Sequence, residues 1–177
     1  MNAQLKSLVL VFAVMQIANR FDLDREENVT YFRISYAAVQ ALSLLILYYV
    51  RITILRKNDE TPFYYTKAPP PMSGEKGEDV QTTVKAYDLE QLREQVKQTL
   101  IGIAIMAALH LHWGYIRPLF LQSVLGLVNL AQTPLFQVYI LKYPLEGELA
   151  RPWSKLGSGA TATTLKDIKA REKKAAK

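Results

Sequence analysis

The chain has 177 residues, of which 50% are hydrophobic and 21% are charged, and its formal net charge is +6. These averages suit a soluble domain, but the charges are segregated, because four stretches of 13, 17, 19 and 24 residues contain no Asp, Glu, Lys or Arg. The stretches are 7–19, 34–50, 98–116 and 118–141. A single soluble core with an alternating surface is therefore excluded, and the absence of cysteine excludes disulfides and thiolate metal sites.

Residues 1–19 form the first apolar segment. Its uncharged part would extend only about 20 Å as a helix, which is shorter than the roughly 30 Å hydrocarbon core of a bilayer. Lys6 is the only basic residue before it and no small-x-small cleavage site follows, so we interpret it as a retained helix. Two placements stay open, one interfacial and one spanning. A charged connector, residues 20–30, follows.

Residues 31–55 are the clearest predicted transmembrane helix. The uncharged part corresponds to about 25 Å of helix, and aromatic residues stand near both ends, as in aromatic belts. These aromatic residues are Tyr31, Phe32, Tyr36, Tyr48 and Tyr49. Residues 56–87 are expected to be a loop, because Pro62, Pro69 to Pro71, Gly74 and Gly77 disfavour regular structure in the first half of the polar 51–98 region.

The second half of the chain predicts two more spans and a tail. Asp88 with Gln91 at the third position is typical of a helix cap, so we expect one helix over 88–116 that begins in the loop and continues into the membrane. Arg117-Pro118 makes a tight joint, and residues 117–141 form a transmembrane helix kinked near Thr133. Residues 142–177 are a polar tail with 9 basic and 4 acidic residues.

Basic residues set the expected orientation. The 51–98 region carries 8 Lys and Arg and the tail carries 9, whereas the 20–33 region carries 3 and the Arg117 joint 1. The positive-inside rule therefore places the loop and tail in the cytosol and the 20–30 connector in the lumen. The side of the N-terminus stays open. The predicted fold class is an all-α membrane protein with three transmembrane helices and a short N-terminal apolar helix, interfacial or spanning.

Small and polar residues recur on one helical face of each predicted span. They are Arg33, Tyr36, Gln40 and Ser43, then Thr99, Gly102, Met106 and His110, then Gln122, Gly126, Asn129 and Thr133. Two interpretations stay open: the faces pack the helices together, or they surround a partly wet groove. For the groove hypothesis the expected lining residues are Arg33, Gln40, Ser43, His110, Gln122 and Asn129.

Motifs for catalysis are missing from the sequence. It has no Walker loop, nucleotide-binding glycine fingerprint, HExxH or nucleophile elbow. His110 and His112 are the only histidines, and their i,i+2 spacing points them about 200° apart on a helix, so they do not bind one metal together. We therefore expect neither enzyme activity nor a cofactor.

The end of the tail is strongly basic. Two roles stay open for it: contact with phosphates of anionic lipid or RNA, or a solvated topology signal. The residues expected to make such contacts are Lys166, Lys169, Arg171, Lys173 and Lys174.

Several short motifs, in order and spacing, resemble one known family over about residues 1 to 155. They are Lys57-Asn58-Asp59, Met72-Ser73-Gly74-Glu75, Gln81-Thr82-Thr83-Val84, Tyr87-Asp88-Leu89, His110-Leu111, the run from Pro118 to Ser123, Gly147-Glu148-Leu149 and Arg151-Pro152. The family is the fungal inorganic phosphate transport protein family, which is also that of the third component of the SRP-independent (SND) targeting pathway of the endoplasmic reticulum.

The resemblance implies a multi-pass protein of the endoplasmic reticulum membrane that helps deliver or insert client proteins without the signal recognition particle. Implied partners are the bilayer, the Sec translocon, other SND components, membrane-protein clients and the ribosome, reached through the loop or basic tail. The three predicted spans have the plan of an Oxa-type insertase core, so a polar intramembrane groove is the expected mechanism. The alternatives are a structural partner of the translocon and a small-solute or phosphate transporter.

Overall fold

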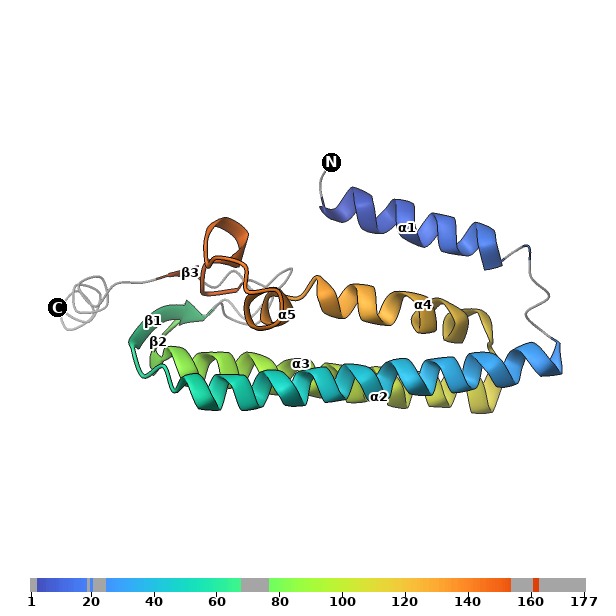
Figure 1. Cartoon of the computed structure of the whole chain (residues 1–177), viewed down its shortest axis with the longest axis horizontal. Helices are drawn as coiled ribbons and strands as arrows, with labels where there is room; N and C mark the ends of the chain where they lie inside the picture. Colours follow the sequence, from blue (N-terminus) through green and yellow to red (C-terminus); the bar gives the residue numbers. More distant parts are fainter. Residues whose placement is uncertain (1–2, 19, 21–24, 68–76, 154–160, 163–177) are drawn as a thin grey trace.

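The computed structural model describes residues 3–18, 20, 25–67, 77–153 and 161–162. The described chain is mostly helical, as the sequence predicts, and Figure 1 shows the elements in order. They are α1 (Ala3–Ala18), α2 (Glu26–Lys57), β1 (Pro62–Lys67), β2 (Glu78–Thr83), α3 (Val84–Trp113), α4 (Arg117–Ala131), α5 (Pro134–Tyr139), a 3-10 helix η1 (Gly147–Leu149) and β3 (Thr161–Ala162).

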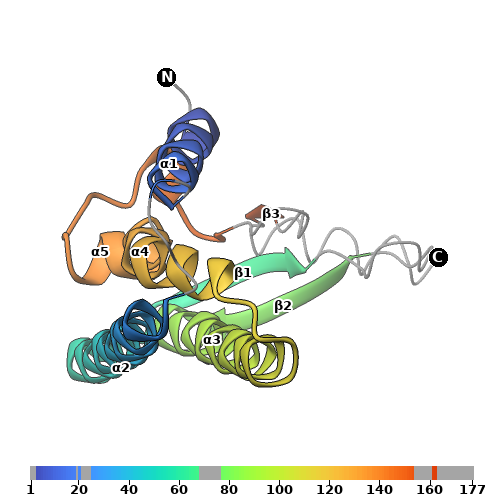
Figure 2. The same ribbon diagram turned by 90° about the vertical axis from the view of Figure 1, so that its right-hand side faces the viewer.

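Helices α2, α3 and α4 run lengthwise beside one another, and α1 lies against α4 (Figures 1 and 2). α2 packs against both α3 and α4, whereas α3 and α4 touch each other much less. With 32 residues, α2 is about 48 Å long. It therefore extends beyond a hydrocarbon core of roughly 30 Å and reaches the sheet at its C-terminal end.

The ends of α2 carry charges that suit a helix of this length. Glu26 and Glu27 occupy the first turn and Arg56 and Lys57 the last, so each pair complements the helix dipole. Asn58 ends the helix in a left-handed conformation with φ of 46°. The helix begins five residues before the predicted 31–55 span and takes in part of the predicted connector.

The outer surfaces of α2 and α3 are apolar. Leu45 is 64% exposed, Ile105 56% and Leu111 80%, although such side chains are usually covered in a soluble protein. Among the described helices, α2 is the one that is long and apolar enough to cross a membrane. The surface is compatible with membrane association, and the predicted three-span arrangement stays a prediction.

A small sheet corrects the all-α prediction. β1 and β2 form an antiparallel hairpin, with Pro62 opposite Thr83 and Lys67 opposite Glu78, and β3 pairs with the other edge of β1. The hairpin falls in the stretch that was expected to lack regular structure. The run Phe63 to Thr66 consists of aromatic and β-branched residues, which favour a strand. The prediction gave more weight to the neighbouring prolines and glycines.

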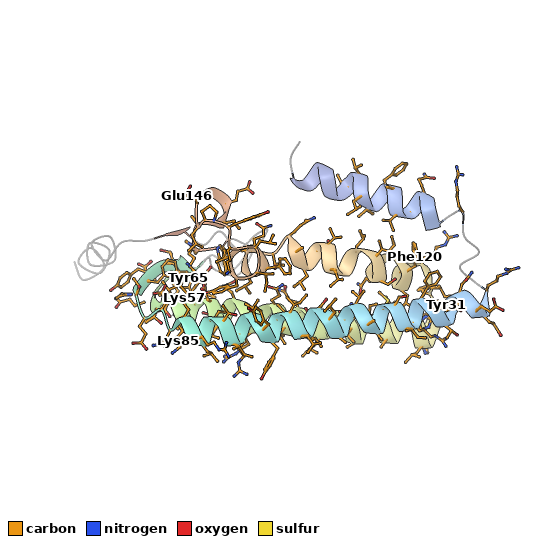
Figure 3. The ribbon with its side chains drawn as sticks, viewed as in Figure 1. Tyr31, Lys57, Tyr65, Lys85, Phe120 and Glu146 are labelled. Atoms are coloured by element: carbon orange, nitrogen blue, oxygen red, sulfur yellow. The ribbon has the colours of Figure 1, made fainter. Side chains whose placement is uncertain are left out.

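A hydrophobic core cluster lies at the sheet end of the bundle, where Figure 3 labels Tyr65. Tyr65, Tyr87 and Trp153 pack there against the C-terminal part of α2 and against α5. The aromatic rings of Tyr65 and Tyr87 meet edge to face, with centroids 5.2 Å apart. Residues 142–153, which the sequence assigned to a polar tail, therefore fold back onto the bundle and complete its core.

The start of α3 differs from the prediction, and the structure locates the break between α4 and α5. α3 begins at Val84, and the Thr83 side chain accepts a hydrogen bond from the Ala86 amide, so Asp88 is not the cap. α4 ends at Ala131 and α5 begins at Pro134. The break occurs where proline lacks a donor, and the Thr133 hydroxyl accepts from the Phe136 amide at 3.4 Å.

Candidate functional site

A cavity of about 660 Å³ lies among α2, α3 and α4 and continues to α5 and Trp153. Nine of its sixteen lining residues have uncharged polar side chains, and none is an Asp, Glu, Lys or Arg. Along α3 the lining runs from Gln91 to Ile103, which corresponds to about 18 Å of helix. The volume corresponds to roughly twenty water molecules at about 30 Å³ each.

Carboxamide side chains dominate the polar lining. They are Gln40, Gln91, Gln95, Gln98, Gln122 and Asn129. None of the six makes a side-chain hydrogen bond within the described part of the chain. Each amide has two donors and an acceptor oxygen, and leaving these groups unpaired in hydrocarbon is costly. The cavity is therefore suited to water or a polar guest rather than to acyl chains.

The three hydroxyls of the lining already donate to backbone carbonyls three or four residues earlier in the chain. Ser43 donates to the Val39 carbonyl at 2.8 Å, and Thr99 donates to the Gln95 carbonyl at 2.9 Å. Thr133 donates to the Leu130 carbonyl at 2.7 Å. The side-chain donors that remain for a guest thus belong mainly to the amides.

Two glycines explain why the packing of α2, α3 and α4 leaves a cavity between the helices. A Cβ on Gly126 of α4 would lie 2.8 Å from the Val39 side chain of α2, so this glycine allows α2 and α4 to approach closely. A Cβ on Gly102 of α3 would meet nothing within 4 Å. Because α2 holds α4 tightly while α3 stands away from α4, the cavity forms on the α3 side.

A buried ion pair lies one helical turn before Gln91, at the sheet end of the cavity. Asp88 is fully buried and accepts a hydrogen bond from Arg151 Nε at 2.7 Å, with further bonds from the second Arg151 nitrogen and from the Tyr139 hydroxyl. The Arg151 side chain is 8% exposed. A buried carboxylate needs such paired donors, so the cluster fixes α3, α5 and the following segment to one another.

Trp153 closes this end of the cavity. Its backbone amide donates to the Tyr87 hydroxyl at 2.7 Å, and its indole nitrogen donates to the Leu149 carbonyl at 2.9 Å. The Arg151 guanidinium lies 5.1 Å from the centroid of its ring. A buried tryptophan held by three contacts is a rigid wall, and it belongs to the segment that the sequence assigned to the tail.

The protonation states of this cluster follow from its burial. Burial raises the pKa of the Tyr87 hydroxyl to about 12, so this phenol remains protonated at neutral pH. Burial lowers the pKa of Arg151, but the hydrogen bonds and negative charge of Asp88 outweigh it and the net shift is upward. Arg151 is therefore charged, and the cluster acts as a fixed structural ion pair.

Arg33 and His110 do not line the cavity and contact each other instead. Arg33 Nε donates to His110 Nε2 at 2.8 Å, so the imidazole carries its proton on Nδ1, which lies 3.2 Å from the Tyr115 carbonyl oxygen. His110 is 8% exposed and sits about two turns beyond Ile103, toward the joint between α3 and α4. The pair ties α2 to that joint.

The structure thus brings together four of the six residues that the groove hypothesis names. Gln40, Ser43, Gln122 and Asn129 line the cavity. The sequence analysis missed three glutamines of α3, namely Gln91, Gln95 and Gln98. Their spacing continues the Thr99 and Gly102 face toward the start of the helix. Gln98 is the first residue of the uncharged 98–116 stretch, and extending the search before that stretch would have found Gln91 and Gln95. The basic residues 166–174 lie outside the described residues.

We also searched the described part of the chain for a metal site. It contains no group of three or more His, Asp or Glu side chains that could hold a metal ion. The cavity itself offers neutral donors and acceptors. This arrangement can solvate polar groups, and the three hydroxyls of the lining each donate to a backbone carbonyl.

The described residues thus define a mostly helical protein in which α2 is long and apolar enough to span a membrane, α2 and α3 expose apolar side chains, and the helices enclose an uncharged polar groove. All of residues 1–177 match the family model described as Phosphate transport (Pho88), and the chain belongs to this family. This agrees with the resemblance carried by the sequence motifs.

Three curated fungal proteins are similar over most of their length. The SRP-independent targeting protein 3 homolog of Schizosaccharomyces pombe is 36% identical over 95% of this chain and 88% of its own. SRP-independent targeting protein 3 of Saccharomyces cerevisiae is 32% identical over 86% and 81%, and an uncharacterized S. pombe protein is 39% identical over 87% and 77%. No solved structure matches the chain.

Proposed function

We propose that this protein takes part in SRP-independent targeting at the endoplasmic reticulum and inserts client proteins into the membrane there. The observation that carries the proposal is the set of six unpaired carboxamides in a cavity bounded by helices with apolar outer surfaces. The names of two relatives, SRP-independent targeting protein 3 and its homolog, support the pathway. The protein works beside the Sec translocon, other SND components and the ribosome.

The cavity would lower the barrier that a hydrophilic flank of a client meets. A charged residue at the membrane centre costs about 2.5–3.5 kcal/mol on insertion scales, because hydrocarbon offers it no hydrogen bonds. Amide side chains within the bilayer replace part of the lost hydration. The groove thus shortens the apolar path, as in the Oxa-type plan of three helices around a polar groove.

Phosphate transport, which the family description names, fits the cavity less well. Phosphate sites in proteins use Arg, Lys or clustered backbone N–H groups. The cavity lining contains no cationic side chain. We therefore favour a polypeptide client over an inorganic anion.

The proposal needs a multi-pass topology with the sheet end of the bundle in the cytosol. α2, α3 and α4 then cross the membrane, the joint at Gly114 to Arg117 faces the lumen, and residues 142–153 lie on the cytosolic side. This topology places the two regions richest in Lys and Arg in the cytosol.

The sequon Asn28-Val29-Thr30 provides a test of this topology, because it lies in the first turn of α2 on the proposed lumenal side. A Gly/Ser insert between Thr30 and Tyr31 moves Asn28 away from the membrane and should lead to its glycosylation in microsomes. The glycan is detected as an endoglycosidase-sensitive mass shift that Asn28→Gln abolishes. If instead a sequon placed in the 68–76 stretch is glycosylated, the proposed topology is inverted.

Reconstitution tests the insertion activity itself. Purified protein in liposomes should raise the insertion of a membrane protein with a short translocated flank at least several-fold over empty liposomes, measured by protease protection of that flank. Liposomes with an unrelated helical membrane protein at the same density are the control. Binding to the translocon without any gain in insertion would assign the protein a structural role instead.

A further inference from the structure

All the polar side chains that line the cavity are uncharged, and this restricts the ligands that the cavity can recognise. The charged residues of α3 nearest to it, Arg93, Glu94 and Lys97, lie between the lining glutamines in sequence but outside the lining. At the lumenal end, Arg33 is engaged with His110. The groove is therefore polar without a fixed charge of either sign along its length.

Carboxamides differ from charged side chains in one respect that matters for recognition. Each can donate through its nitrogen or accept through its oxygen, so it solvates a cation, an anion or a peptide group by reorienting. A fixed Arg or Lys would attract acidic segments and repel basic ones, and a fixed Glu would do the reverse. An amide groove discriminates against apolar segments but not between the two signs of charge.

The dimensions fit a short stretch of extended chain. The lining covers about 18 Å of α3, and an extended polypeptide rises about 3.3 Å per residue, so about five residues fit along it. Such a stretch presents unpaired backbone N–H and C=O groups that six free amides can match. A phospholipid headgroup, in contrast, brings a phosphate for which the lining has no cation.

We propose that the cavity binds about five residues of extended polypeptide from the translocated flank of a client, through its peptide groups and polar side chains, without selecting the sign of their charge. This inference rests on the proposed insertion function and names the substrate class of the same groove. It assigns the recognition to the unpaired amides of Gln40, Gln91, Gln95, Gln98, Gln122 and Asn129.

The test uses the full chain in liposomes and three clients that are identical except for five flank residues, which are Gln and Ser, Lys, or Asp. The wild-type protein should insert the Lys and Asp clients within about twofold of each other, after correction for empty liposomes. Gln122→Lys should favour the Asp client and Gln122→Glu the Lys client, each by roughly tenfold, because the new charge lies inside the groove. The matched controls Gln81→Lys and Gln81→Glu change an exposed glutamine of β2 outside the lining and should leave the ratio unchanged.

The outcomes separate the two proposals. A wild-type preference of more than fivefold for one sign, with insertion intact, overturns the inference and leaves the proposed function standing. Equal ratios in both Gln122 variants show that the flank does not enter this groove and also overturn it. A photocrosslinker at Gln95 that captures lipid but no client flank does the same. Absence of any insertion by the wild-type protein removes the proposed function and the inference with it.

Discussion

Gly102→Phe is expected to reduce client insertion at least fivefold without lowering the stability of the protein. Gly102 lines the cavity, and a Cβ placed there meets no atom within 4 Å, so the new ring fills the groove instead of displacing a neighbour. Glycine in a helix interior costs about 1 kcal/mol relative to alanine, and its removal therefore does not weaken α3. The measurements are insertion in liposomes and the midpoint of thermal unfolding in detergent.

Two further variants identify the cause of the loss. Gly102→Ala adds a methyl group and should retain most of the insertion activity. Gly126→Val introduces bulk where a Cβ lies 2.8 Å from the Val39 side chain, so it should destabilise the α2–α4 contact by about 1–3 kcal/mol. Full activity of Gly102→Phe at normal stability would show that clients do not use the cavity.

Asp88→Asn is expected to cost about 3–5 kcal/mol in the free energy of unfolding, because it leaves the buried Arg151 charge without its partner. The bonds from Tyr139 and Arg151 converge on this carboxylate, so the loss should also release residues 142–153 from α3. Chemical denaturation in detergent measures the first effect. Faster tryptic cleavage after Lys142, at the start of the same segment, measures the second.

An exposed ion pair of the same region serves as the control. Lys67 Nζ and Glu90 Oε1 are 3.9 Å apart, and both side chains are about half exposed. Solvent screens this pair, so Lys67→Gln should change the free energy of unfolding by less than about 1 kcal/mol. If Asp88→Asn costs no more than Lys67→Gln, the buried cluster does not hold the C-terminal segment in place.

Much of the helical framework could be predicted from the sequence, and the exceptions have identifiable causes. Uncharged stretches of 17 to 24 residues predict long helices because helix formation and hydropathy depend on neighbouring residues. The hairpin was missed because prolines and glycines dominated the averaged composition around the Phe63 to Thr66 run. A run of only four strand-favouring residues predicts a strand weakly, because the stability of a strand depends on the partner strand that pairs with it.

Asp88 shows why local patterns can mislead. An Asp three residues before Gln91 satisfies the pattern of a helix cap, and the same carboxylate can accept from a distant arginine. Arg151 is 63 positions away in the sequence, and nothing near Asp88 indicates this partner. Thr83, five residues earlier, had an equally suitable side chain for the cap and is the one that the chain uses.

The sequence by itself determined where the long helices lie, the break at Pro134 and the one polar face that each predicted span carries, because these depend on residues within a few turns of one another. Only the tertiary structure decided which polar groups meet. Arg33 pairs with His110, 77 positions away, while Gln91, Gln95 and Gln98 join Gln40, Gln122 and Asn129 around the cavity. The physical reason is that α2 packs closely against α4 at Gly126 and α3 stands apart, and such spacing between helices is set by side chains that are remote in the sequence.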